Sequence, residues 1–379
     1  MIYILIISIG LIGANSLVLS PIAAEVAAGF SLANPADVMA AAAAYGGGVA
    51  ISALLLAPLA DKFGADTALR QSMILIVAAI AVSASAPNST VLIVAQALAG
   101  VGAGMALPAI YSLAVLIAKK GQEARTIGKV LTGWTLSMVG GVTLSAFIAD
   151  IFGWRAVYGT LSLALAAVLI LLYYVDLPEA PKSKRTTSPI SALKVPGIVP
   201  ALFSVCVLGA SFYGVYNYLG THITLSLGYD TSANGWFTLS YGLGFAAAML
   251  FDPFLDRVGA RRGLIAVFAL NSLYLVLMAN LATVYLWLCL SMFGWGALQH
   301  LGLNLTVGRL SMLDASQRGA IMGLNSAVMY ISVFAATLTY RPIFDGWGLA
   351  VCMLVSAVLM VFGSLEALLA RQRTKALET

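Results

Sequence analysis

The chain is built from long apolar runs separated by short polar segments. Most runs approach or exceed the roughly 20 apolar residues that a helix needs to cross a bilayer. Because backbone polar groups must be satisfied within a membrane, such runs predict helices. We place twelve spans, at residues 2–24, 37–58, 70–86, 90–117, 129–150, 154–175, 197–222, 233–253, 263–281, 284–308, 320–340 and 347–369. The sequence therefore predicts an all-α integral membrane protein.

Composition excludes several classes of protein. Of the 379 residues, 61% are apolar and 9% are charged, whereas soluble domains carry about 25% charged residues. The net charge of +5 is small, and the basic residues are spread over many loops, which argues against nucleic-acid binding. We find neither a phosphate-binding Gly-rich loop nor a catalytic or metal-ligating arrangement. We therefore expect no enzyme, no ATP-driven pump, no metal and no cofactor.

The positions of Lys and Arg predict the orientation of the spans. With both termini in the cytoplasm, eighteen of the twenty basic residues fall in inner segments, and only Arg155 and Arg341 fall outside. Loops kept on the cytoplasmic side are enriched in Lys and Arg. This partition supports both the twelve-span count and cytoplasmic termini, and it predicts a multi-pass protein of a bacterial-type inner (plasma) membrane.

A polar segment near the midpoint predicts two domains. The stretch Asp176–Pro196 contains four prolines and the basic run Lys182–Arg185, which is typical of a flexible linker. We predict an N-terminal six-helix bundle at 1–176, a cytoplasmic linker at 177–196 and a C-terminal six-helix bundle at 197–379.

Landmarks recur between the two predicted bundles. The segment 58–65, PLADKFGA, is echoed 195 residues later by 253–260, PFLDRVGA. Arg125 before span five matches Arg318 before span eleven, and Gly153-Trp154 matches Gly346-Trp347, both 193 residues apart. The sequence thus predicts a duplicated plan, which is typical of secondary transporters with a substrate site where the halves meet.

The loop after span two carries the most specific motif. Asp61, Lys62 and Gly64, and in the second copy Asp256, Arg257 and Gly259, match the pattern Gly-x-x-x-Asp-Arg-x-Gly-Arg-Arg/Lys. On these residues the chain resembles the major facilitator superfamily. The glycines of span five (133, 140 and 141), followed by 153–155, GWR, resemble the drug/metabolite–proton antiporters of arabinose-efflux-permease type. The resemblance implies twelve helices in two pseudo-symmetric bundles, which we expect to act as a monomer.

The motif aspartates predict a cytoplasmic gate. An aspartate at a span end needs a partner, and the repeat offers Asp61 the start of span eleven near Gly319, and Asp256 the start of span five near Gly128. The alternative is an aspartate that caps its own loop. The predicted gating residues are Asp61, Lys62, Gly64, Arg125, Asp256, Arg257, Gly259 and Arg318.

Two positions depart from the family pattern. Gln96 stands where span four of the family has an arginine tied to proton coupling, and a glutamine cannot carry a proton at physiological pH. Thr143 replaces the proline that follows the glycines of span five, so that a kink there is not required. These departures leave coupling to protons open.

His300 is the one titratable residue that we place well inside a span. It is predicted either to line a central cavity or to bond a neighbouring helix, and it is the candidate proton carrier. We see no embedded Arg or Lys, which favours a neutral or weakly charged, partly aromatic substrate. The candidate substrate-binding residues are Asn15, Gln96, Tyr213, Asn217, Tyr241, Trp295, His300, Asn304, Asn325 and Tyr330.

Three functions remain open from the sequence. The first is a secondary transporter that exports a small organic metabolite or drug-like molecule by alternating access, in exchange for protons or without them. The second is an uptake permease or facilitator that is not coupled to protons. The third, of another class, is a membrane sensor or assembly factor on a transporter fold. The expected partners are the substrate, membrane lipid and, in the coupled case, a proton.

Overall fold

The chain forms a bundle of long helices in a computed structural model that describes residues 1–56, 63–119, 122–178, 188–314 and 317–377. Within these, side chains are not described at 123–125, 256, 318 and 370–377. The first part of the chain forms α1 (Ile2–Leu17), α2 (Ala23–Gly29), α3 (Met39–Leu55), α5 (Ala65–Ala84), α6 (Ser89–Leu116), α7 (Glu123–Leu136), α8 (Thr143–Phe152) and α9 (Trp154–Tyr174). The second part forms α10 (Ile198–Thr221), α11 (Ala233–Ala248), α12 (Asp252–Val258), α13 (Ala260–Leu281), α14 (Tyr285–Ser311) and α15 (Arg318–Leu377).

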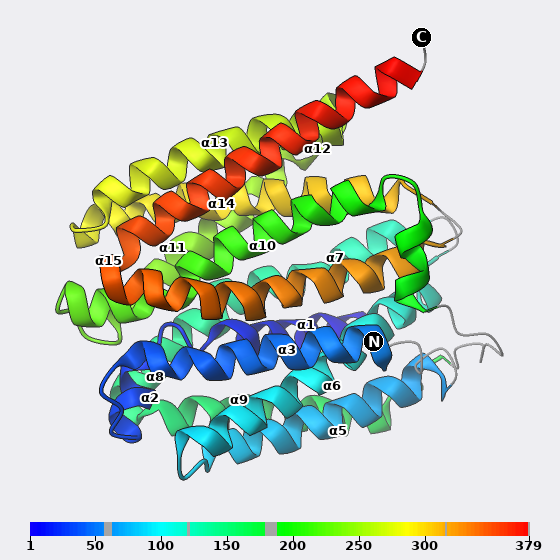
Figure 1. The fold of residues 1–379 in the computed structure, drawn as a ribbon. Coiled ribbons are helices and arrows are strands. Elements are labelled where there is room, and N and C mark those ends of the chain that lie inside the picture. The colour runs from blue at the N-terminus through cyan, green and yellow to red at the C-terminus, as the bar shows by residue number, and fades with distance from the viewer. Residues whose placement is uncertain (57–62, 120–121, 179–187, 315–316, 378–379) are drawn as a thin grey trace.

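Figure 1 shows α1–α9 on one side of the bundle and α10–α15 on the other, with both termini at the same end. Two seams join these groups. Helix α3 packs against α15, and α11 packs against α7, α8 and the segment between them. Buried side chains from both groups form one continuous apolar core.

By length and composition, nine helical stretches among the described residues could cross a membrane. One of them, Gly319–Leu369, reverses direction at Gly348, where the backbone is non-helical (φ 78°, ψ −176°), so it contains two of the predicted spans (Figure 1). Helix α1, with 16 residues, is shorter than those nine, and α14, with 27, is not among them. The all-helical membrane class is confirmed, and the count of twelve spans stays a prediction.

The first span is shorter than predicted. Helix α1 ends at Leu17, and a turn separates it from α2, whereas one run over 2–24 was expected. Pro21 explains the break, because it has no N–H to donate to the carbonyl of Leu17 and its ring disfavours helix at the preceding residue. The Leu17 carbonyl instead accepts a hydrogen bond from the hydroxyl of Tyr216 on α10 (3.4 Å).

The fifth predicted span is irregular at its glycines. A π-helical turn, Ser137–Val142, separates α7 from α8 and contains Gly140 and Gly141. The hydroxyl of Thr143 donates to the carbonyl of Met138, five residues earlier (3.1 Å), which matches the wider π-helical spacing. The missing proline therefore does not leave a regular helix, because glycines and a threonine hydroxyl produce the irregularity without it.

Glycines with positive φ mark equivalent helix starts in the two groups. Gly64 before α5 and Gly259 before α13, which occupy the same place in the two copies of the loop motif, have φ 95° and 83°. Gly153 before α9 has φ 81°. Gly348 lies 195 residues later, the same interval that separates Gly64 from Gly259, and has φ 78°. The predicted match of Gly153-Trp154 to Gly346-Trp347 is therefore shifted by two residues. Burial agrees, because Trp154 and Leu349 are both buried whereas Trp347 is exposed.

Helix crossings repeat as well. A Cβ atom at Gly100 of α6 would overlap the backbone carbonyl of Tyr45 on α3, and one at Gly296 of α14 would overlap the carbonyl of Tyr241 on α11. Gly100 and Gly296 are 196 residues apart in the sequence, and so are Tyr45 and Tyr241. Glycines let two helices approach to backbone contact, so α3 is locked to α6 in the same way as α11 is locked to α14.

The outer helices repeat their cross-links too. Arg70 of α5 donates its Nε–H to the carbonyl of Leu172 on α9 (3.2 Å), and Arg261 of α13 donates to that of Ala367 on α15 (3.3 Å). The two acceptors are 195 residues apart, which is the interval of the loop motif, whereas the two arginines are 191 residues apart, so the donors differ by about one helical turn within the repeat. The repeat seen in loop motifs thus extends to helix packing, where the sequence alone did not show it.

Candidate functional site

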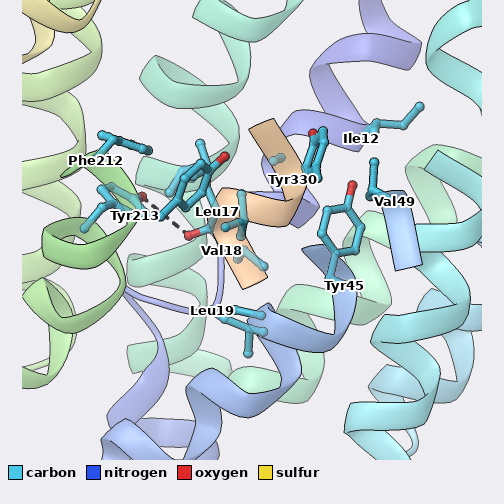
Figure 2. Close-up of a cluster of buried hydrophobic side chains, with 14 of the residues drawn as sticks. Ile12, Leu17, Val18, Leu19, Tyr45, Val49, Phe212, Tyr213 and Tyr330 are labelled. Atoms are coloured by element: carbon cyan, nitrogen blue, oxygen red, sulfur yellow. Dashed lines mark hydrogen bonds between the residues drawn. The ribbon is translucent and has the colours of Figure 1, made fainter. Parts of the chain in front are cut away.

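Buried aromatic side chains meet near the middle of the bundle, where the two groups of helices face each other. Figure 2 shows Tyr45 of α3 and Tyr330 of α15 together with Leu17 and Val18, and Phe212 and Tyr213 of α10 beside them. The rings of Tyr45 and Tyr330 are 6.3 Å apart and packed edge to face. This pair bridges the seam between α3 and α15.

A second aromatic group lies on the α10 side, and we call it the aromatic cluster. Phe212 is its centre, with its ring centroid 5.0 Å from Tyr216, 5.5 Å from Tyr241 and 5.3 Å from Trp295. Tyr241 and Trp295 pack edge to face at 5.4 Å. The cluster consists of Phe212, Tyr213, Tyr216, Tyr241, Phe245 and Trp295. The predicted residues Tyr213, Tyr241 and Trp295 are therefore brought together.

A narrow void adjoins the aromatic cluster at the seam between α11 and the π-helical turn. Its lining comes from both groups of helices: Leu17, Met138, Val142, Tyr216, Thr238 and Tyr241. The space is too narrow to hold a water molecule, so the seam is closed here. Thr143 and Thr238 close it further with a hydrogen bond between their hydroxyls (3.2 Å).

Some buried polar atoms near this centre have no protein partner. The indole N–H of Trp295, the hydroxyl of Tyr45, the side-chain oxygen of Asn15 and the amide nitrogen of Gln299 are buried without a hydrogen bond. Such groups cost free energy unless something satisfies them. They provide both donors and an acceptor, as an uncharged polar solute would require.

His300 is bonded to a carboxylate. Its Nε2 lies 3.0 Å from Oδ1 of Asp252, the first residue of α12. The two side chains are 12% and 30% exposed, so this pair keeps some access to solvent. The imidazole also packs edge to face on Phe245, with centroids 4.8 Å apart, which connects it to the aromatic cluster.

Three other predicted residues form bonds between helices. The side-chain amide of Asn15 donates to Gln96 (3.1 Å), and that of Gln96 donates to Ser83 (3.0 Å), so α1, α6 and α5 are linked. Asn217 donates to the hydroxyl of Thr337 (2.7 Å), which links α10 to α15. Gln96 uses both ends of its amide in this way, while Asn15 keeps an unbonded oxygen.

The remaining candidates are less enclosed. Asn304 is exposed and Asn325 is half-buried. Tyr45 was missed by sequence reasoning. The 195-residue interval of the loop motif leads from the predicted residue Tyr241 to Gly46, one residue away, and only the crossings at Gly100 and Gly296 identify Tyr45 as its equivalent.

A charged pair joins α14 to α15. Arg309, in the last turn of α14, forms two hydrogen bonds with Glu366 of α15 (2.7 and 2.8 Å), and Ser204 of α10 bonds to both of them. The Arg309 and Glu366 side chains are only 15% and 14% exposed. The sequence placed Arg309 in a cytoplasmic segment and Glu366 in the last turn of its span; Arg309 lies at the end of α14, whereas α15 continues beyond Glu366.

The predicted gate is only partly visible. Asp61 and Lys62 lie outside the described residues, and the side chains of Arg125, Asp256 and Arg318 lie outside the described side chains. Gly64 and Gly259 have the positive φ that a tight turn requires, and Arg257 is exposed. The contacts of Asp61 and Asp256 with opposite helices stay predictions.

Comparison with known proteins gives the family. The family model of the major facilitator superfamily matches residues 5–337. The chain belongs to this superfamily. A major facilitator protein is a secondary transporter rather than an enzyme, and it moves a small-molecule substrate through a multi-pass membrane bundle.

Three relatives within the superfamily show how far the similarity reaches. An "Uncharacterized MFS-type transporter YwfA" of Bacillus subtilis (strain 168) is 26% identical over 97% of this chain and 90% of that protein. A "Probable sugar efflux transporter" of Pasteurella multocida (strain Pm70) is 26% identical over 66% and 63%. An "Uncharacterized MFS-type transporter YbcL" of Bacillus subtilis is 22% identical over 72% and 73%.

Proposed function

We propose that this major facilitator protein exports a small, uncharged, partly aromatic or sugar-like solute in exchange for protons. It acts as a monomer of twelve spans in a bacterial-type inner membrane, with both termini in the cytoplasm. The halves 1–176 and 197–379, joined by the linker 177–196, rock against each other and expose the site to alternate sides. Among its relatives, the drug/metabolite–proton antiporters are the group that this proposal favours.

The aromatic cluster at the seam carries this proposal. Ring faces of Phe212, Tyr216, Tyr241 and Trp295 gather beside a void to which both groups of helices contribute. Aromatic rings provide a large apolar surface with a polar edge, which suits a flat solute or the apolar face of a sugar. Opening the seam would enlarge the void and expose these rings.

Charge argues for an uncharged substrate. Arg309, in the last turn of α14, is neutralised by two bonds to Glu366. The unbonded groups near the centre, on Trp295, Tyr45 and Asn15, are neutral donors and an acceptor. The relative from Pasteurella multocida, which is named a probable sugar efflux transporter, supports the same class.

One observation favours a second function, a permease or facilitator that is not coupled to protons. Gln96 occupies the position of the coupling arginine of the family, and its amide is held between Asn15 and Ser83, where no group can carry a proton. This alternative shares the substrate site with the first function. It differs in predicting no response to a pH gradient.

Reconstitution tests both functions. Purified protein in proteoliposomes would be assayed with radiolabelled glucose, arabinose and phenyl β-glucoside, with and without an imposed pH gradient. We expect phenyl β-glucoside to move fastest, and to accumulate only with the gradient. Flux that ignores the gradient would select the facilitator, and no flux of any probe would contradict the proposed substrate class.

A matched pair of variants tests the site. Tyr241→Leu removes a ring from the aromatic cluster and should raise KM for phenyl β-glucoside about fivefold, because one aromatic contact is worth about 1 kcal/mol beyond its buried area. Tyr274→Leu serves as the control, since this half-buried tyrosine of α13 bonds the carbonyl of Ser291 away from the seam. Equal KM values in both variants would contradict the assignment.

A further inference from the structure

The His300–Asp252 pair connects a titratable group to a helix that carries a family motif. Asp252 begins α12, and this helix contains Asp256 and Arg257 of the second motif copy, with Gly259 directly after it. We call α12 the motif helix. A change in the bond at Asp252 therefore acts on the first residue of the segment that the family pattern assigns to gating.

The pair has no equivalent in the first group of helices. The interval of 196 residues that relates the crossing at Gly100 to that at Gly296 leads from His300 to Gly104, and the 195-residue interval of the loop motif leads from Asp252 to Ala57. Neither position can hold a proton. The backbone crossings are common to both groups of helices, whereas the His300–Asp252 pair occurs in the second group alone. This difference indicates that the pair has a role other than packing the helices of the repeat.

Asp252 is the charged group that faces His300 closely. Helix α14 packs against α10, α11, α12, α13 and α15. These helices contribute other titratable groups, but Glu366 is held by Arg309, and Arg261 bonds the carbonyl of Ala367. Tyr213 and Tyr216 on α10 and Tyr241 on α11 belong to the aromatic cluster. The side chain of Asp256, on the motif helix itself, is not among those described.

We propose that His300 binds the transported proton and that it acts through Asp252 on the motif helix. This inference rests on the proposed exchange of solute for protons, and it names the residue that couples the two. A proton arriving from outside bonds to the imidazole, and the imidazolium donates Nε2–H to the Asp252 carboxylate. Loss of that proton to the cytoplasm restores neutral imidazole, so that one N–H bond is formed and broken in each cycle.

The strength of the bond to Asp252 depends on this proton. A neutral imidazole already forms a charge-assisted hydrogen bond to a carboxylate, and protonation adds the attraction between two opposite charges, so protonated His300 holds the start of the motif helix more firmly. The neutral imidazole holds it less firmly and allows it to move. Phe245 packs edge to face against the imidazole and belongs to the aromatic cluster. It therefore transmits the change in the His300–Asp252 bond to the place where the solute binds.

Cysteine accessibility on the motif helix tests the coupling without any solute. Leu255 is buried, while its neighbour Phe254 is exposed. Leu255→Cys and Phe254→Cys would each be placed in a protein whose three native cysteines are replaced by alanine, and labelled with a membrane-impermeant maleimide at pH 6 and pH 8. The labelling rate of Leu255→Cys is divided by that of Phe254→Cys, so that the intrinsic effect of pH on thiol reactivity cancels.

We expect this ratio to fall about tenfold from pH 8 to pH 6 when His300 is present. His300→Gln and Asp252→Asn should each reduce the change to less than about twofold. His222→Gln is the matched control, because His222 is the other histidine of the chain and bonds the carbonyl of Ala282. A ratio that still depends on pH in His300→Gln, or one that is constant in the parent, would overturn the proposal.

Transport of phenyl β-glucoside in proteoliposomes separates this inference from the proposed function. His300→Gln should lose accumulation driven by a pH gradient, whereas the matched control His222→Gln should keep it. Accumulation that persists in His300→Gln would overturn the assignment of His300 to the proton. If the parent protein transports none of the probes but its labelling ratio still depends on pH, the proposed substrate class is wrong and the assignment of His300 as the proton site is retained.

Discussion

Arg341 of α15 lies 2.9 Å from Asp37, which precedes α3, so an ion pair joins the second group of helices to the first. The same guanidinium bonds Asp345 one turn later (2.6 Å), and Asn34 donates to Asp345 across the seam (3.2 Å). These residues lie at the end of the bundle opposite the termini (Figure 1). In the proposed orientation they form an outer latch between the halves.

Arg341→Gln should therefore loosen the outer end of the seam. Exposed ion pairs contribute about 0.2 to 1 kcal/mol each, and this guanidinium serves two, so we expect a cysteine at the buried position Ser20 to be labelled about fivefold faster. Arg155→Gln is the control, because Arg155 bonds the carbonyl of Ala86 within the first group of helices. Equal labelling in the two variants would rule out the latch.

Glu366→Gln should destabilise the protein strongly. It would leave Arg309 largely buried and charged without its carboxylate, which costs about 3 to 5 kcal/mol. The double variant Arg309→Met with Glu366→Leu removes both charges and should recover most of this loss. Thermal unfolding in detergent measures it. An unchanged melting temperature in Glu366→Gln would show that the pair contributes no stability.

The two glycine crossings should be equally intolerant of side chains. Gly100→Ala and Gly296→Ala each bring a methyl group into a backbone carbonyl of the facing helix, so the helices must separate at a cost of about 1 to 3 kcal/mol. Gly159→Ala is the control, since a Cβ atom there meets nothing within 4 Å. Lower folded yield in only one of the two variants would contradict the equivalence of the crossings.

The shift in the repeat can be tested at three glycines. Gly153 and Gly348 have positive φ with extended ψ, a region that is essentially restricted to glycine. Gly153→Ala and Gly348→Ala should each cost about 1 to 3 kcal/mol, whereas Gly346→Ala should be nearly neutral. Melting temperatures measure this. A larger loss at Gly346 than at Gly348 would restore the pairing of Gly153 with Gly346.

The lengths of the apolar runs were sufficient to locate most helices but not to predict where each one ends, because local backbone chemistry decides the ends. The predicted runs at 90–117 and 154–175 agree within one residue with α6 and α9. Pro21 ended the first helix early because a single missing donor outweighs a continuing apolar pattern. The π-helical turn at Gly140 and Gly141 was likewise invisible to hydropathy, which does not register hydrogen-bond spacing.

The candidate site was predicted by residue type but not by pairing. Tyr213, Tyr241 and Trp295 were selected as aromatic residues on inner spans, and they do meet around Phe212. The partner of His300 was not foreseen, because Asp252 lay at the end of a span, 48 residues earlier in the chain. Contacts between distant segments depend on helix rotation and depth, which a single sequence does not fix.

The crossings at Gly100 and Gly296 limit how this transporter can move. Where two backbones touch, no side chain lies between them that could change rotamer to accommodate sliding. We therefore expect each of the pairs α3–α6 and α11–α14 to move as a unit, with changes in packing at the contacts of α3 with α15 and of α11 with the π-helical turn.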